Sequence, residues 1–257
     1  MKHGDFTELA EFYVHRPGYS GLLLNMLYAY VKSTRPPNQD FIVADVGAGT
    51  GKLTENLAAL GLAGYAVEPN EAMRKNGINA LKDAPFTWLK GTAEATGLPD
   101  NCCNWVLMGS SFHWADTEQA LRDFHRILRP GGYFTAIYNP RNIEKSAFHQ
   151  NIEEKIAQMV PGLRRVSSGS SKNMKDMDEK LLSTKYFGDL IFSEAAHTEI
   201  MSKERYLGAW KSVNDIQVQA GPEGFRKILD FIQAEISPYA EIEVPYKSRS
   251  WTVRTIF

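Results

Sequence analysis

Three glycines at alternate positions mark one short stretch of this sequence. Gly47, Gly49 and Gly51 follow an apolar run at 41–46 and precede a segment, 53–60, that is typical of a helix. Glycine permits positive φ angles and lets a ligand approach the backbone closely. The bend between this strand and helix is therefore a candidate ligand site, and Asp45 lies directly in front of it.

The spacing of the glycines argues against a dinucleotide or a phosphate-binding P-loop. The G-x-G-x-x-G fingerprint needs a third glycine where this chain has Lys52, and the four-residue gap of a P-loop is missing. A carboxylate at position 45 would also repel phosphate groups, whereas it would suit a cationic ligand. The plainer alternative is an ordinary turn with an exposed Asp45.

A second acid, Glu68, ends the next expected strand, 17 residues past Gly51. An acid at this place can accept hydrogen bonds from both hydroxyl groups of a ribose. The two acids and the glycine bend together indicate a ligand with a ribose and a positive group but no pyrophosphate. S-adenosylmethionine has these features.

The segment SSFHWAD at 110–116 follows the fourth expected strand and contains the best-placed candidate for a general base, His113. A neutral imidazole can take a proton from a hydroxyl or amine acceptor, with an ordinary pKa of about 6.5. The alternative is that His113 bonds the backbone and shapes the pocket, since a carboxylate acceptor needs no base. Trp114 either forms a wall for the substrate or packs on the next helix.

The N-terminal element YVHRPGYS is expected to close over the ligand with Tyr13, His15, Arg16 and Tyr19. Arg16 is a candidate partner for the carboxylate of the methionine part or for an anionic substrate; the alternative is a solvated side chain on a capping segment. A basic cluster further on is either solvated or draws in an anionic substrate. Its members are Arg164, Arg165, Lys172 and Lys175.

Strands and helices alternate from about residue 40 to 139, which predicts an α/β fold with a parallel, doubly wound sheet. Ligands on such sheets bind beyond the carboxyl ends of the strands. The alternation stops after the fifth expected strand, where 142–185 is polar and helical in pattern. The expected strands are 41–46, 64–69, 86–91, 104–109, 133–139, 195–201 and 247–257.

Composition narrows the function further. The chain has 257 residues and a net charge of −1, with 29 basic and 30 acidic residues, so a nucleic-acid partner is not expected. The N-terminus has no signal-peptide pattern, and no apolar stretch reaches the roughly 20 residues of a membrane span. We therefore expect a cytoplasmic protein without a membrane partner. Adjacent Cys102 and Cys103 build no disulfide framework, and no metal-binding pattern occurs.

Six motifs together resemble the class I S-adenosylmethionine-dependent methyltransferases. The resemblance is to the small-molecule type, similar to ubiquinone/menaquinone-type and trans-aconitate-type methyltransferases. It covers residues 12–140 well and the C-terminal third loosely. The motifs are VADVGAGTG, AVEPNEAM, GTAEATGLPD, SSFHWAD, LRPGGYF and YVHRPGYS.

This resemblance implies a Rossmann-like seven-stranded sheet, mostly parallel with an antiparallel last strand, plus a helical lid inserted after strand five. It divides the chain into an N-terminal cap (1–40), a cofactor-binding core (41–141), the lid (142–194) and a C-terminal completion of the sheet (195–257). For the substrate it implies Tyr13, Tyr19, Ser111 and Trp114. For the cofactor it implies Asp45, Gly47, Ala48, Gly49, Glu68, Pro69, Met73, Thr92, Ala93, Glu94, Ser110 and Arg16.

Two positions depart from the family pattern. Thr92 stands where many relatives carry an acid that reads the adenine amino group, and Asn104 replaces the usual acid before the fourth strand. The segment SSFHW also differs from the (Asn/Asp)-Pro-Pro-aromatic sequence of DNA amino-methylating enzymes, which favours a small-molecule acceptor.

Other functional classes remain as alternatives. One is a non-catalytic, S-adenosylmethionine-binding regulatory protein, and another is a nucleotide-dependent oxidoreductase, which Asp45 and Lys52 oppose. Arsenite methylation by the cysteine pair is not expected, since the pair precedes a strand and lies far from the strand tips. A monomer or a homodimer is expected.

Overall fold

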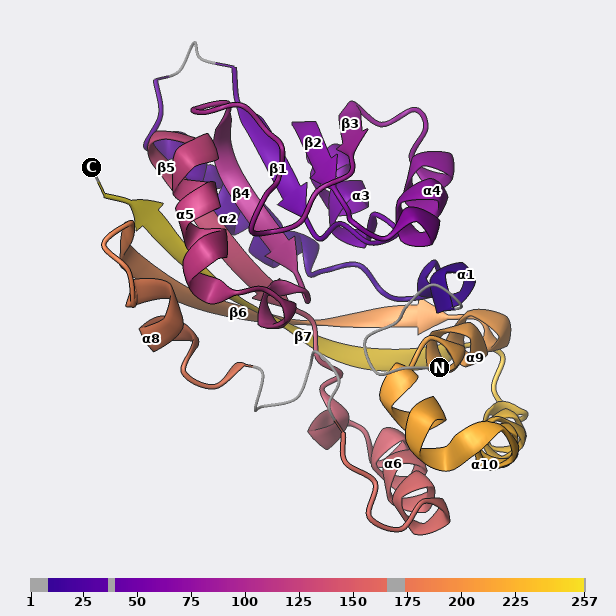
Figure 1. Cartoon of the computed structure of the whole chain (residues 1–257). Helices are drawn as coiled ribbons and strands as arrows, with labels where there is room; N and C mark the ends of the chain where they lie inside the picture. Colours follow the sequence, from indigo (N-terminus) through magenta and orange to yellow (C-terminus); the bar gives the residue numbers. More distant parts are fainter. Residues whose placement is uncertain (1–8, 37–39, 166–173, 257) are drawn as a thin grey trace.

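The computed structural model describes residues 9–36, 40–165 and 174–256. Its centre is a seven-stranded sheet with the order β3-β2-β1-β4-β5-β7-β6 (Figure 1). The first five strands pair in parallel, whereas β7 is antiparallel to both β5 and β6. The mixed sheet confirms the predicted fold and its antiparallel last strand. The strands are Ile42–Val46 (β1), Ala63–Val67 (β2), Phe86–Leu89 (β3), Cys103–Gly109 (β4), Leu128–Tyr138 (β5), Phe187–Met201 (β6) and Ile242–Thr255 (β7).

Helices cover both faces of the sheet, as continuous apolar strands require. Buried side chains of α2 and α3 pack on one face against Val43 and Trp105, and those of α5 and α8 pack on the other against Ala44 and Val106. The helices are Ala10–Tyr13 (α1), Gly21–Ser33 (α2), Lys52–Ala59 (α3), Glu71–Ala80 (α4), Thr117–Ile127 (α5), Ala147–Met159 (α6), Met177–Leu182 (α8), Lys203–Lys211 (α9) and Asn214–Ile236 (α10).

Short polar side chains set where the helices around the site begin. Ser20, Asn70 and Asp116 each accept a hydrogen bond from the backbone N–H three residues later, which satisfies one otherwise unpaired donor. Asp116 is thus the N-cap of α5. These caps fix the directions in which the chain leaves the strand tips.

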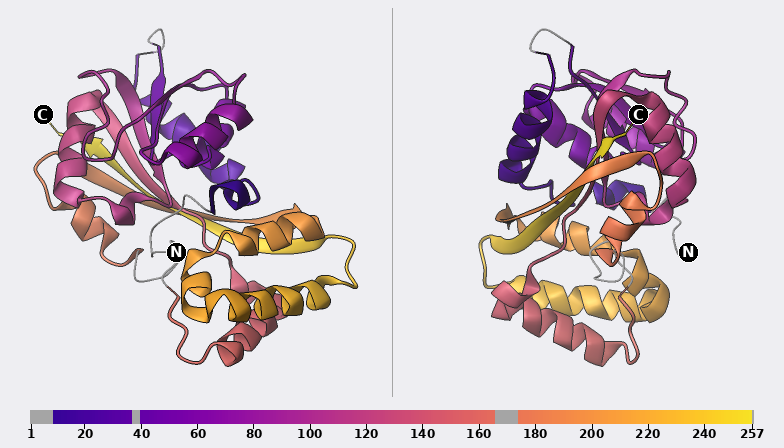
Figure 2. Two further views of the ribbon diagram at one scale, coloured as in Figure 1. Left: turned by 45° about the vertical axis from the view of Figure 1, so that its right-hand side comes forward. Right: turned by 90° about the vertical axis from the view of Figure 1, so that its left-hand side faces the viewer.

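The long antiparallel pair of β6 and β7 extends past the parallel strands and carries a separate cluster of α6, α9 and α10 (Figure 2). Ile152 and Ile156 of α6 are buried there against Trp210 and Ile232. The expectation that the sixth strand starts at residue 195 was wrong, because β6 already begins at Phe187. The side chains of β6 alternate between half-buried and exposed. Its first part, 187–194, therefore shows only a weak apolar pattern in the sequence.

The segment expected as an insertion, 142–194, contains the short 3-10 turn η3 (Ile143–Lys145), α6, α8 and the beginning of β6. Its residues 166–173, including Lys172 of the basic cluster, lie outside the described part of the chain. α10 bends at Gly221, which has φ 66° and precedes Pro222, so this helix consists of two parts. Across the described ranges, no helix has the length and apolar character needed to cross a bilayer.

Candidate active site

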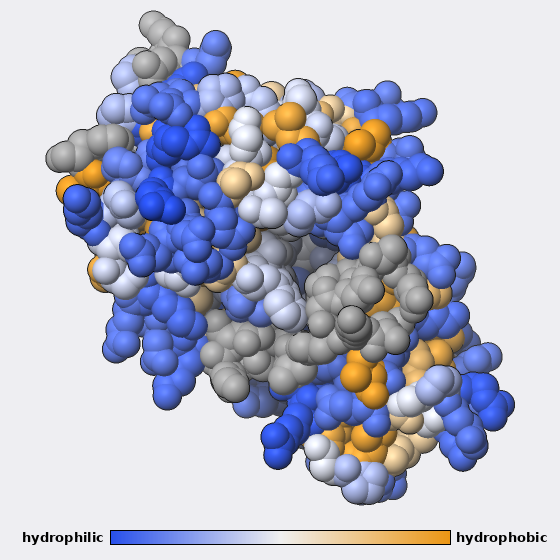
Figure 3. Space-filling view, viewed as in Figure 1, coloured by the Kyte–Doolittle hydropathy of each residue, from blue (hydrophilic) through white to orange (hydrophobic). Residues whose placement is uncertain are grey.

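A cavity of about 760 Å³ opens at the carboxyl ends of the parallel strands. Figure 3 shows this face of the molecule, which is hollowed near its centre. His15 does not line this cavity, whereas every residue proposed for the cofactor, the acceptor or catalysis does, although the roles of these residues remain a proposal. They are Tyr13, Arg16, Tyr19, Asp45, Gly47, Ala48, Gly49, Glu68, Pro69, Met73, Thr92, Ala93, Glu94, Ser110, Ser111, His113 and Trp114.

The glycine bend has the backbone that its sequence indicates. Gly47, Gly49 and Gly51 have φ angles of 70°, 58° and 88°, a region that other residues rarely adopt. A Cβ atom added at Gly49 would meet no atom within 4 Å, whereas one at Gly47 would lie 2.8 Å from the Ser111 hydroxyl oxygen. The bend is therefore open at Gly49, on the side of the cavity where a ligand would approach.

Asp45 is completely buried at the end of β1, so the alternative of an exposed Asp45 is wrong. Its Oδ2 accepts a hydrogen bond of 2.6 Å from the Thr54 hydroxyl, while Oδ1 has no hydrogen-bond partner among the described residues. Burial raises the pKa of this carboxyl to about 7, although the bonds from Thr54 act in the opposite direction. A cation bound nearby would stabilise the charged form.

Glu68 joins the ends of β1 and β2. Its Oε2 accepts a hydrogen bond from the backbone N–H of Gly49, and its Oε1 accepts one from the backbone N–H of Asn70, both at 2.8 Å. Burial raises the pKa of Glu68, and these two backbone bonds lower it. Each carboxylate oxygen retains a second lone pair, so both can also accept from a ligand.

The loop after β3 explains the departure at Thr92. The Thr92 hydroxyl accepts a hydrogen bond from the backbone N–H of Ala95, and Glu94 accepts one from the backbone N–H of Asp116. These side chains therefore hold their own loops in place at the cavity wall. Met73 and Ala93 are buried and give the same wall an apolar surface.

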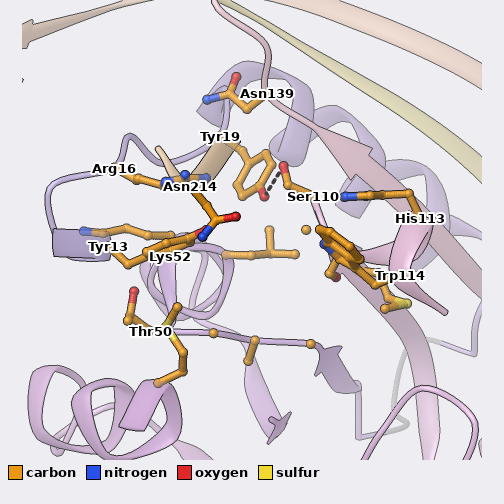
Figure 4. A pocket seen from close by; sticks show the side chains of 18 of the residues that line it. Tyr13, Arg16, Tyr19, Thr50, Lys52, Ser110, His113, Trp114, Asn139 and Asn214 are labelled. Carbon is orange, nitrogen blue, oxygen red and sulfur yellow. Dashed lines mark hydrogen bonds between the residues drawn. The ribbon is translucent and has the colours of Figure 1, made fainter. Parts of the chain in front are cut away.

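The N-terminal element forms one wall of the cavity. Arg16 donates two hydrogen bonds of 2.8 Å to Ser212, one to its hydroxyl and one to its carbonyl, and lies over the ring of Tyr13. The Tyr19 hydroxyl pairs with the Ser110 hydroxyl at 3.1 Å (Figure 4). The alternative of a solvated Arg16 is wrong, because its guanidinium is fixed to the end of α9.

His113 lies in the 3-10 turn η2 (Phe112–Trp114), with its ring between Trp114 and Tyr138. Both ring nitrogens are buried and have no hydrogen-bond partner among the described residues. Burial, with a smaller contribution from the charge of Lys180, lowers the pKa of His113 to about 4. The expectation of an unperturbed pKa near 6.5 is therefore wrong, and His113 is neutral across the physiological range.

The outer half of the cavity was not found from the sequence. Residues after β5, at the junction of α9 and α10, on α6 and on β7 meet there. Arg165 of the basic cluster also reaches it and pairs with Glu153 and Asp215, so it is not merely solvated. Apart from Arg165, which the basic cluster already includes, only Arg141 could have drawn attention in the sequence, because it lies just past a strand end. The lining residues of this half include Asn139, Arg141, Glu153, Arg165, Asn214, Asp215 and Tyr246.

Cys102 and Cys103 precede and begin β4, whereas the cavity lies at its other end, beyond Gly109. Their sulfur atoms are 3.3 Å apart and both thiols are free. The cysteine pair is therefore remote from the cavity, as its place in the sequence indicates.

Comparison with known proteins agrees with the architecture. Residues 44–136 match the family model of the methyltransferase domain. An uncharacterized methyltransferase of Mycobacterium tuberculosis is 42% identical over 102 residues, which is 39% of this chain and 40% of that protein. An uncharacterized methyltransferase of Schizosaccharomyces pombe is 26% identical over 222 residues, which is 83% of this chain and 80% of that protein. The mycobacterial match thus spans about two fifths of that relative's length.

A solved structure of a type II methyltransferase from Anaeromyxobacter dehalogenans superposes with a TM-score of 0.66 and 19% identity, covering 93% of this chain and 97% of that chain. This likeness concerns the fold. The seven-stranded sheet has the Rossmann-like fold of that methyltransferase structure. The match to the methyltransferase-domain model is confined to residues 44–136, the part of the chain that holds the glycine bend and both acids.

Proposed function

We propose that the protein binds S-adenosylmethionine in the inner half of the cavity and transfers its methyl group to a small molecule in the outer half. The arrangement of Asp45, Gly49 and Glu68 carries this proposal. Two acids end neighbouring strands on either side of a bend that is open at Gly49. Asp45 Oδ1 is buried without a partner in the described chain, which suits a cationic ligand group.

The residues present fit the parts of this cofactor. Asp45, Gly47, Ala48 and Gly49 would lie near the amino-acid end, and Arg16 would pair with its carboxylate. Glu68 would accept hydrogen bonds from the ribose hydroxyls through its remaining lone pairs. Pro69, Met73, Thr92, Ala93 and Glu94 would border the adenine, largely by apolar contact and by the shape of their loops.

The bound cofactor supplies a methyl group already activated by its sulfonium. The protein's contribution is then to align the acceptor atom with that carbon and to exclude water. Tyr19 and Ser110 fix the wall beside the fourth strand through their hydrogen bond. Ser111, His113, Trp114 and Tyr13 would complete the wall around the acceptor. His113, neutral and without a side-chain hydrogen-bond partner in the described part of the chain, would accept a proton from a hydroxyl or amine acceptor or hydrogen-bond the acceptor without taking one.

Calorimetric titration with S-adenosylmethionine and S-adenosylhomocysteine tests the cofactor assignment. Gly49→Val should abolish binding of both, because the branched side chain would occupy the open side of the bend. Gly61→Val is a matched control, because Gly61 also has a positive φ of 74° and open space around its Cβ position, but it lies outside the cavity. Normal binding by a folded Gly49→Val variant would refute the assignment. Release of S-adenosylhomocysteine from a pool of small acceptors separates an enzyme from a non-catalytic binding protein.

A further inference from the structure

Asn214 has a buried side-chain amide in the outer half of the cavity, away from the residues proposed to bind the cofactor. Its side chain is at the start of α10, the residue is 7% exposed, and it lines the cavity. Neither its Oδ1 nor its Nδ2 has a hydrogen-bond partner among the described residues. Figure 4 shows the amide projecting into the cavity, across from His113 and Trp114. Buried polar atoms of this kind are normally hydrogen-bonded, so the amide calls for a ligand.

Arg141 is the second feature of the outer half. Its guanidinium lies over the ring of Trp210, with 4.1 Å between the guanidinium carbon and the ring centroid, and its backbone bridges to Tyr246. Its carboxylate partner in the described chain, Glu153, is 3.5 Å away. The side chain is only 16% exposed, so the packing holds the guanidinium in one orientation at the cavity wall.

The charges around Arg141 are unevenly shared. Glu153 also pairs with Arg165, which has a second carboxylate partner, Asp215, at 3.2 Å. Arg165 is thus well neutralised, whereas Arg141 shares one carboxylate through a long contact. A guanidinium retains further donors in a planar fork that matches a carboxylate. The two arginines and the two carboxylates already balance in number, so the remaining donors of Arg141 could hold a singly charged carboxylate, whereas a doubly charged group would be repelled more strongly by Glu153 and Asp215.

We propose that Arg141 and Asn214 form an acceptor-binding subsite that anchors a small carboxylic acid by its carboxylate. Arg141 provides the charge-assisted bonds and the Asn214 Nδ2 provides a further donor. The anchored end lies across the cavity from His113 and Trp114, so the atom to be methylated belongs to another part of the acceptor. This inference rests on the proposed methyl transfer and specifies the chemical class of its acceptor.

The test uses a panel of small monocarboxylic acids, each paired with its primary amide, and the full-length protein saturated with S-adenosylhomocysteine. Calorimetry should detect binding of acids from the panel, with each matched amide at least tenfold weaker. Equal binding of acids and amides, or no binding of any acid to the cofactor-loaded protein, would overturn the proposal. Failure to bind S-adenosylhomocysteine at all would instead refute the cofactor assignment, so the two failures are distinguishable.

Turnover of the acids by the loaded enzyme then assigns the residues. Arg141→Gln should raise KM for an acid at least tenfold, while kcat and the Kd for S-adenosylmethionine stay within about twofold. Asn214→Asp keeps the shape but adds a negative charge, so it should raise KM for the acid more than for its amide. Arg249→Gln is the matched control, because this arginine also pairs with a carboxylate, Glu194 at 3.1 Å, but lies outside the cavity. An unchanged KM for the acid in Asn214→Asp and in a folded Arg141→Gln variant would remove both residues from the subsite.

Discussion

The carboxylate of Glu68 accepts a hydrogen bond of 2.8 Å from the backbone N–H of Gly49. The same carboxylate accepts a second bond from the N–H of Asn70, so one side chain spans the bends after β1 and β2. Glu68 therefore acts on the protein even without a ligand, because it holds the glycine bend in position.

Replacing Glu68 should affect binding and stability together. Glu68→Ala removes a charged acceptor worth about 1.5–3 kcal/mol for each ligand hydroxyl it holds, so the affinity for S-adenosylhomocysteine should fall roughly tenfold to a hundredfold. It also leaves two backbone donors unpaired, so the melting temperature should fall. Glu71→Ala is the control, an exposed acid that lies outside the cavity. Calorimetry showing unchanged affinity for Glu68→Ala would remove Glu68 from the site.

Asp45 should make the free protein less stable as the pH rises. Its folded pKa of about 7 lies above the ordinary value, so the folded state binds more protons than the unfolded state between about pH 4 and pH 7. The stability present below this window is lost as the pH rises through it. Asp45→Asn lacks this titration. The difference in free energy of unfolding between this variant and wild type should therefore shift in favour of the variant by roughly 2–4 kcal/mol between pH 4 and pH 8. Urea unfolding of both proteins at both pH values measures this shift. An equal change in the free energy of unfolding of wild type and variant would show that Asp45 is not a buried carboxyl that titrates in this range.

The same carboxyl should make cofactor affinity depend on pH in the opposite direction. A cationic ligand favours the charged form of Asp45, so affinity for S-adenosylmethionine should increase from pH 5.5 to pH 8. Asp45→Asn should bind more weakly at pH 8 and show little of this dependence. Titrations at several pH values decide the point, and an equally steep dependence in the variant would assign it to another group.

The rate of methyl transfer should not show a histidine titration near pH 6.5. His113 has a pKa of about 4 and is already neutral above about pH 5.5, so single-turnover rates at saturating ligands should be flat from there to pH 8.5. If the acceptor atom is a hydroxyl or amine, His113→Ala should cost roughly 100-fold in kcat. If it carries no proton to be removed, mainly KM should rise. His125→Ala, outside the cavity, is the control. Unchanged kcat and KM in His113→Ala would show that His113 only forms part of the cavity wall.

Arg16 should contribute to binding only when the ligand has an amino-acid end. Arg16→Gln should weaken S-adenosylhomocysteine roughly tenfold to a hundredfold, the scale of a lost charged hydrogen bond. It should leave 5′-methylthioadenosine unaffected, because that compound lacks the carboxylate. Ser212→Ala, which removes one of the bonds that hold the guanidinium, should have a smaller effect in the same direction. Equal losses for both ligands would show that Arg16 acts on the shape of the cavity instead.

The inner half of the cavity could be located from the sequence because its residues are local to strand ends. Asp45 and Glu68 end consecutive strands, and the positive φ angles of the bend require glycine at 47, 49 and 51. The same local signals gave the parallel strands and the helices between them. The bonds of Glu68 to two backbone groups were not visible in the sequence, since they depend on the relative position of two bends.

The outer half could not be located because it depends on contacts between distant segments. Arg141, Asn214 and Tyr246 come from a loop, a helix start and a strand, and no local pattern relates them. His113 was found by position, but its lowered pKa arises from burial that only the folded chain reveals. The early start of β6 was missed because an edge strand with half-exposed side chains has little apolar alternation.

The bonds of the N-terminal element also bear on how the protein is made. Arg16 reaches Ser212, and the backbone N–H of Ser20 donates to the hydroxyl of Ser248, 228 positions later in the chain. Contacts of such long range form slowly during folding. During synthesis on a ribosome, the parallel strands β1 to β5 emerge well before Ser248 does. The contacts that hold the N-terminal element in place thus have to wait until Ser212 and Ser248 have emerged, well after the segment with the glycine bend.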